Sequence, residues 1–179
     1  MSIRKSIVPA TLILAVTSVA PRSLVVAPTT TISDSLRIFY IGRPAGWEHY
    51  ELKPSATGVT LTSDYDYVDR GRRNHSQLTL TTGNDYSLKK YETVRLTDTS
   101  RTVVTSIEFD GTHAKVMRNS KSTDVAVPAV AYAVSSYSPT AQHLALIRYW
   151  ESHGRPKTMA IVPGDPNPVT IKRRGLEHE

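Results

Sequence analysis

The segment that most constrains the fold is 58–82, in which polar and apolar residues alternate on either side of a short charged centre, 69–73. In the first half, every second residue falls on one face, and these residues are Val59, Leu61, Ser63, Tyr65 and Tyr67. The residues between them, which include two aspartates, fall on the other face. A period of two is typical of a β-strand with one face in water. The segment therefore predicts two long strands of a sheet with one buried and one polar face.

Other strand-like segments follow at regular spacing and are separated by turn residues. We expect strands at 36–41, 47–52, 101–109, 112–118, 158–162 and 169–172, with 86–96 part strand and part irregular and 119–123 a polar loop. Asp110-Gly111 is the strongest hairpin signal, because both central residues of the matching turn type need positive φ. A further turn is expected at 83–85.

One segment, 139–153, predicts a helix. Ser138 is suited to cap its N-terminus, Pro139 fits the first helical position, and Gly154 fits the left-handed position past the end. The broad apolar stripe of this helix is expected to comprise His143, Leu146, Ile147 and Trp150. The chain is thus predicted to be mainly β, or α+β at most. The predicted architecture is a curled antiparallel sheet or partial barrel of about 8–10 strands, with the helix over its concave face or one open end.

The domain organisation follows from the composition along the chain. Residues 1–27 begin with a basic pair and an apolar run, which indicates a signal peptide or an N-terminal anchor. Segment 28–35 is expected to be a linker, 36–175 a single domain, and 176–179 a tail that marks a truncation point or a vector remnant. We therefore expect an exported protein, periplasmic or extracellular, which touches a membrane only through 1–27 if that segment is uncleaved.

Several kinds of chemistry are disfavoured by the residues present. The 179 residues include no cysteine, and the six histidines form no H-x-H or H-x-x-x-H pair, so we expect no metal and no cofactor. The chain has no glycine-rich phosphate loop and no nucleophile elbow. Its formal charge of +6 is spread over the sequence, and no basic helix or aromatic-interleaved motif points to nucleic acid.

Three groups of residues are candidates for a site, each with a structural alternative. Asp69 and Arg70, next to a glycine, could bind a ligand or form a tight bend or bulge. Trp47, Tyr65 and Tyr67 could line an apolar pocket of a curled sheet or belong to its core. Asp64 and Asp66 share a face and could act as paired carboxylates, although a wet sheet face is the interpretation that we favour.

The order of several short motifs resembles that of a known domain. These motifs are Gly42, Gly46, Glu48 and Tyr50, then 67–71, the helix segment 148–156, Pro163, and finally Val169, Ile171, Arg174 and Gly175. The chain resembles the β-rich N-terminal domain that precedes the catalytic barrel in secreted bacterial amidohydrolases of the imidazolonepropionase-like type. The resemblance covers about 36–175. It implies an accessory domain, whose partner would be a downstream hydrolase domain. No catalytic residue carries over, because the H-x-H pair and the barrel are missing.

Three functional hypotheses remain open at this point. The first is a non-catalytic exported accessory domain of an amidohydrolase-type protein. The second is a periplasmic half-barrel module that binds a lipid or another apolar ligand, similar in pattern only to lipoprotein carriers, with Leu146 among the lining residues. The third is an enzyme built on His49, Glu48 and Asp69, although we expect the chain alone to be non-catalytic. The ligand or interface residues that we predict are Trp47, Glu48, Tyr65, Tyr67, Asp69, Arg70 and Trp150.

Overall fold

A computed structural model describes residues 29–134, 138–162 and 169–171, and the expected signal segment 1–27 and tail 176–179 lie outside this part of the chain. Eight strands form one antiparallel sheet in chain order. The strands are β1 (Ile32–Tyr40), β2 (Arg43–Ser55), β3 (Gly58–Asp69), β4 (Arg72–Thr82), β5 (Leu88–Leu96), β6 (Arg101–Phe109), β7 (His113–Arg118) and β8 (Lys121–Ala126). β1 starts within the segment expected to be a linker, and β8 lies partly where a polar loop was expected.

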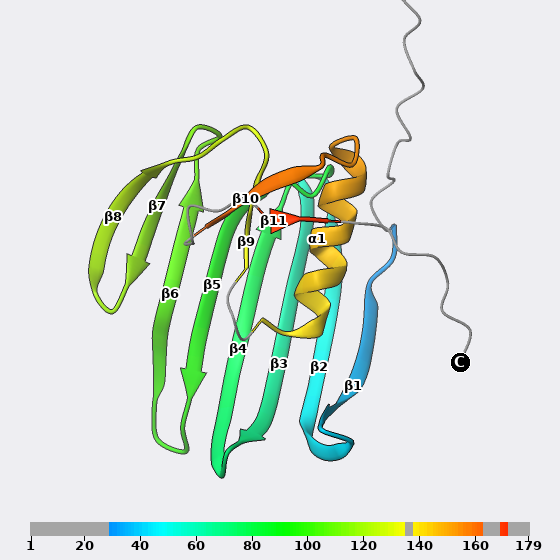
Figure 1. Cartoon of the computed structure of the whole chain (residues 1–179), viewed down its shortest axis with the longest axis vertical. Coiled ribbons are helices and arrows are strands. Elements are labelled where there is room, and N and C mark those ends of the chain that lie inside the picture. The colour runs from blue at the N-terminus through cyan, green and yellow to red at the C-terminus, as the bar shows by residue number, and fades with distance from the viewer. Residues whose placement is uncertain (1–28, 135–137, 163–168, 172–179) are drawn as a thin grey trace, which may run out of the picture.

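The sheet curls around a single helix, α1 (Thr140–Ser152), as Figure 1 shows. A small second sheet of β9 (Ala131–Ala133), β10 (Thr158–Val162) and β11 (Val169–Thr170) lies on the same side. The large sheet does not close into a barrel, because β1 and β8 do not pair with each other. These features confirm the predicted mainly β class, the curled antiparallel sheet and the helix on its concave face. No helix in the described ranges is long and apolar enough to span a membrane.

The hydrophobic core fills the space between the concave face and α1. The predicted face of β3 is buried or partly buried there, and its Leu61 and Tyr65 pack with Leu78 and Leu80 of β4 and Tyr91 of β5. The register explains this arrangement, because Leu61 is paired with Leu80 and Leu80 with Tyr91 across three strands. One face of each long strand therefore contributes to one continuous core, as the alternation predicts.

The face that the helix buries matches only part of the expected stripe. Its buried residues are Ala141, Gln142, Ala145 and Tyr149, whereas Ile147 and Leu144 are exposed. Small side chains on the buried face let the helix lie close to the sheet, and Tyr149 packs on Tyr132 of β9 with ring centroids 5.1 Å apart. Of the predicted apolar stripe, Leu146 and Trp150 pack partly buried against the core, whereas His143 and Ile147 are exposed, and the prediction overlooked the buried alanines.

The turns lie where the sequence predicts them, but one of them has a different backbone conformation from the one expected. Arg70 and Gly71 both have positive φ (49° and 78°), so they form the tight two-residue bend predicted between β3 and β4. In the β6–β7 turn only Gly111 has positive φ. Asp110 acts instead through its carboxylate, which accepts hydrogen bonds from the backbone N–H groups of Thr112 and His113 at 3.0 and 2.7 Å.

Candidate functional site

The buried carboxylate of Glu48 joins the sheet to the start of α1. Glu48 is fully buried on β2. Its Oε2 accepts the backbone N–H of Thr140 at 2.7 Å, and its Oε1 accepts the backbone N–H of Ala141 at 3.0 Å and the hydroxyl of Ser63 at 2.9 Å. The N-cap position is Pro139, which makes no side-chain cap, and not the expected Ser138. A remote carboxylate satisfies the free N–H groups of the first turn and complements the helix dipole.

A small pocket of about 240 Å³ lies beside this carboxylate. Ile38, Tyr65, Tyr67 and the residues Ser138, Pro139 and Thr140 line it together with Glu48. The rings of Tyr65 and Tyr67 are stacked, with centroids 6.2 Å apart and an interplanar angle of 9°. Burial raises the pKa of Tyr65 to about 12, so this phenol is neutral over the physiological range.

A larger open groove of about 510 Å³ runs between α1 and the strands β1 and β2. Its apolar walls come from Leu144 and Ile147 on α1 and from Ile32 and Leu52 on the strands. Three of these, Ile32, Leu144 and Ile147, are exposed although they are aliphatic. Tyr50, Tyr86 and Ala145 complete the floor, and Arg148 and Glu151 form the polar part of the wall. The groove falls within the range of ~300–1,000 Å³ that is typical of small-molecule sites.

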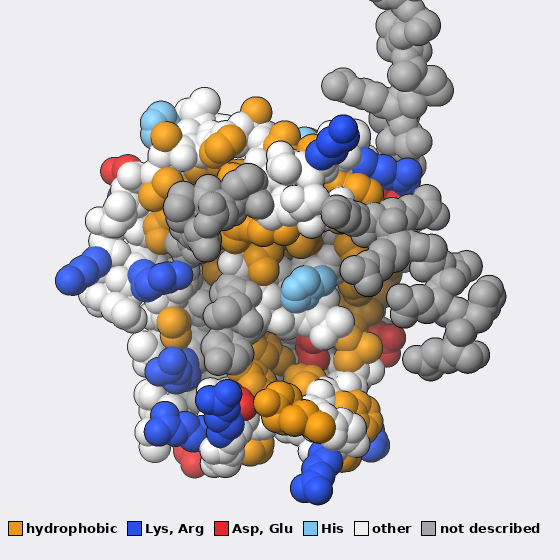
Figure 2. All heavy atoms as spheres, viewed as in Figure 1, with side chains coloured by type: hydrophobic (Ala, Val, Ile, Leu, Met, Phe, Trp, Pro, Cys, Tyr) orange, Lys and Arg blue, Asp and Glu red, His pale blue; other side chains and the backbone are white. Residues whose placement is uncertain are grey.

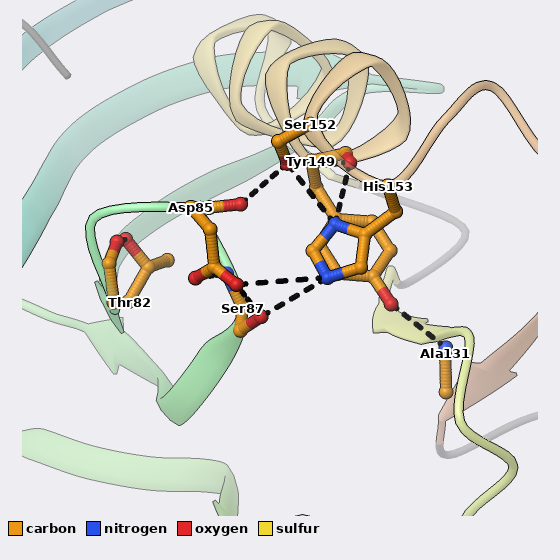
Figure 3. Close-up of polar contacts among 8 residues, drawn as sticks. Thr82, Asp85, Ser87, Ala131, Tyr149, Ser152 and His153 are labelled. Atoms are coloured by element: carbon orange, nitrogen blue, oxygen red, sulfur yellow. Dashed lines mark hydrogen bonds and ion pairs between the residues drawn. The ribbon is translucent and has the colours of Figure 1, made fainter. Parts of the chain in front are cut away.

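The C-terminal end of α1 holds a polar cluster that contains serine, histidine and aspartate (Figure 3). The Nδ1 atom of His153 lies 2.8 Å from the carbonyl oxygen of Tyr149, and its Nε2 atom lies 3.2 Å from Ser87 Oγ and 3.7 Å from Asp85 Oδ2. The Ser87 hydroxyl is 2.7 Å from the same carboxylate. Although burial alone would raise the pKa of Asp85, the hydrogen bonds from Ser87 lower it overall.

This cluster has the residue types of a catalytic triad but not its geometry. In a triad the carboxylate binds the histidine nitrogen opposite to the one that faces the serine. Here serine and aspartate both lie at Nε2, while Nδ1 faces a helix carbonyl. Ser152 also donates to the carbonyl of Asp85. The cluster therefore links the end of the helix to the β4–β5 turn, which is a structural role.

The convex face carries polar pairs that cross neighbouring strands. His75 Nε2 and Gln77 Nε2 lie 2.8 and 3.0 Å from the two carboxylate oxygens of Asp64. Arg73 forms an ion pair with Asp66 at 2.6 Å, and its hydrogen bond lowers the pKa of that carboxyl. Each aspartate is thus engaged by a cross-strand partner rather than paired with the other, as expected for a wet sheet face.

The structure gathers only some of the predicted site residues. Glu48, Tyr65 and Tyr67 share the small pocket. Trp47 lies on the opposite, convex face, where its ring contacts the ring of His75. Asp69 and Arg70 lie at the tip of the β3–β4 hairpin.

Trp150, and His49 and Asp69 of the third hypothesis, do not line that pocket. Trp150 near the end of α1 donates to the Pro156 carbonyl at 2.9 Å. His49 is on the convex face and bonds to Ser35, so it does not meet the carboxylate of Glu48. The sequence reasoning missed the larger groove, because the exposure of Leu144 and Ile147 is known only once the helix is placed on the sheet. In the described part of the chain, no cluster of three or more His, Cys, Asp or Glu could hold a metal ion.

Comparison with known proteins adds no relative: no family model, no curated protein and no solved structure matches this chain.

Proposed function

We propose that this chain is a non-catalytic, exported binding module that holds an apolar ligand in the groove between α1 and strands β1 and β2. The observation that carries the proposal is the exposure of Ile32, Leu144 and Ile147 on facing walls of one groove. Aliphatic side chains that face each other across an open groove gain free energy when an apolar molecule displaces the water between them. Export is proposed from the signal-like composition of 1–27.

The groove favours an elongated amphiphile over a fully apolar molecule. Its walls are aliphatic and aromatic, but Arg148 and Glu151 lie along it on the helix, 3.8 Å apart. A chain-like ligand would lie against Ile32, Leu52 and Leu144, while a polar or anionic head would find the guanidinium of Arg148. A few placed polar groups in an apolar site fix the orientation of a ligand in this way.

Binding of the neutral fluorophore N-phenyl-1-naphthylamine by the full chain tests this proposal. We expect saturable binding with increased emission. Leu144→Glu should weaken this binding by roughly tenfold or more, because a charge then replaces the exposed part of an aliphatic side chain that the ligand would bury. The same change at the adjacent helix position, His143→Glu, is the matched control, because His143 is exposed and does not line the groove. Equal affinity of both variants, or no saturable binding by the native chain, would contradict the proposal.

The accessory-domain hypothesis is a second candidate, and the open sheet edge favours it. In the described ranges β1 pairs on one side only, with β2, along nine residues. An unpaired edge strand can dock a further strand or domain. The native gene decides this point: continuation past codon 179 into a barrel with an H-x-H pair would support an amidohydrolase partner. An in-frame stop directly after codon 179 would leave this candidate without its hydrolase.

A further inference from the structure

Three hairpins at one end of the large sheet form a basic rim. We define this rim as residues 39–44, 68–73 and 95–101, which contain the β1–β2, β3–β4 and β5–β6 turns. In a meander these turns all lie at the same end, which is the lower end in Figure 1. The rim has two acidic residues, Asp69 and Asp98, against six arginines: Arg43, Arg70, Arg72, Arg73, Arg95 and Arg101.

Most of this positive charge is available to a partner. Arg73 is ion-paired with Asp66. Arg43, Arg70 and Arg72 are exposed and have no ion pair within the described residues. The three turns at the opposite end, 53–58, 83–88 and 108–113, carry one lysine against three acidic residues. The turns of the sheet therefore differ in charge between its two ends, and the rim presents the basic one.

The same rim carries bulky apolar side chains that are open to solvent. Ile41 is 83% exposed, and its neighbours Phe39 and Tyr40 are 57% and 55% exposed. Val68, on the adjacent hairpin, is exposed as well. Figure 2 shows hydrophobic side chains gathered at this lower end beside Lys and Arg side chains. Several bulky apolar side chains exposed at one end of the sheet are typical of an interaction surface.

Ile41 is unfavourable for the stability of the turn in which it lies. It has φ of +49° in a two-residue turn with Gly42, a position where asparagine, aspartate or glycine is preferred. A β-branched residue in the left-handed region is an outlier. Because the side chain is also almost fully in water, neither the backbone nor the core explains an isoleucine there.

We propose that the basic rim docks on an anionic lipid bilayer. Ile41, Tyr40 and Phe39 would enter the boundary between headgroups and acyl chains, and Arg43, Arg70 and Arg72 would lie at the level of the lipid phosphates. Apolar tips surrounded by basic residues are the combination that interfacial binding requires, since the two contributions add. An acidic protein or a nucleic acid would satisfy the arginines but would leave the aliphatic tip of Ile41 in water. The proposal does not depend on a ligand in the groove.

Flotation of the full chain with vesicles tests this docking. We expect strong binding to vesicles of equal parts phosphatidylglycerol and phosphatidylcholine, weak binding to phosphatidylcholine alone, and a large decrease at high salt. Arg70→Gln with Arg72→Gln should lower the partition coefficient by roughly 10- to 30-fold. Lys53→Gln with Lys115→Gln, which removes the same charge away from the rim, should leave it within about twofold.

The apolar contribution is tested separately with Ile41→Asn. Asparagine suits the left-handed turn, so the variant keeps the fold, yet it should weaken vesicle binding by about tenfold. The matched control is Val125→Asn, at the end of β8 remote from its turn with β7. Equal binding to both kinds of vesicle, or no effect of Ile41→Asn, would overturn the proposal. Tight binding to soluble poly-aspartate that is insensitive to Ile41→Asn would overturn it in favour of an acidic macromolecule.

Discussion

Replacing Glu48 with alanine is the most informative perturbation of this fold. The carboxylate is fully buried and accepts three hydrogen bonds, from the N–H groups of Thr140 and Ala141 and from the hydroxyl of Ser63. The first two partners are 92 and 93 residues away in the sequence, so this one side chain fixes α1 on the sheet. Alanine would leave two backbone donors of the first helical turn without an acceptor.

The expected loss follows from these contacts. A hydrogen bond to a charged group contributes ~1.5–3 kcal/mol, and a carboxylate at a helix N-terminus ~0.3–1 kcal/mol more. Because the three bonds share one carboxylate and are not additive, we expect Glu48→Ala to lower the free energy of unfolding by about 3–5 kcal/mol. With a urea slope of about 2 kcal/mol per molar, the midpoint would fall by roughly 2 M.

Urea unfolding at neutral pH, followed by circular dichroism, measures this loss. Glu51→Ala is the matched control, because Glu51 is on the same strand but faces the convex side and has no hydrogen bond or ion pair among the described residues. Glu48→Gln, which keeps one acceptor oxygen, should be intermediate. If the midpoints of Glu48→Ala and Glu51→Ala differed by less than about 0.3 M, the capping role assigned to Glu48 would be refuted.

Three further predictions concern other contacts of the fold. The pKa of Tyr65 is about 12 in the folded protein and about 10 in the unfolded chain, so its contribution to stability is complete below pH ~10 and is lost as the pH rises towards 12. Tyr65→Phe should therefore reduce the loss of thermal stability at alkaline pH, as measured by thermal melts. Gly46→Ala should cost several kcal/mol in urea unfolding, roughly 3 or more, because a Cβ there would lie 2.0 Å from the Asp66 carbonyl oxygen. His153→Ala should cost about 1–2 kcal/mol and speed amide exchange near Asp85, whereas unchanged exchange would contradict the link.

The strands were predictable from the sequence because their period of two is a local property. The face of β3 with Leu61 and Tyr65 is buried as the alternation indicates, and the Arg70-Gly71 bend is a local turn. The position of α1 was also predictable, since Pro139 and Gly154 mark its ends. These features depend only on residues that are close together in the sequence, so they can be predicted without knowledge of tertiary contacts.

The buried face and the cap of α1 were not predictable in the same way. Ala141 and Ala145 are buried because the helix lies close to a particular part of the sheet, and residue hydrophobicity does not report that distance. The apolar pattern of the helix placed the bulky Ile147 on its expected core face, although the side chain is exposed. Glu48 was a candidate site residue, but its partners became known only from a contact between distant segments. The groove and the small pocket depend on the same contact.

The two ends of the sheet show how fold and function separate in this protein. The core and the Glu48 contact determine how the sheet curls around α1, and the turn residues can vary with little effect on that arrangement. Ile41 at φ +49° costs about 1–2 kcal/mol relative to a residue that tolerates the left-handed region, and it regains nothing from burial at 83% exposure. Ile41→Asn should therefore stabilise the isolated protein while it weakens docking at the rim. A residue that makes the fold less stable and the surface more apolar is best explained by a partner that buries it.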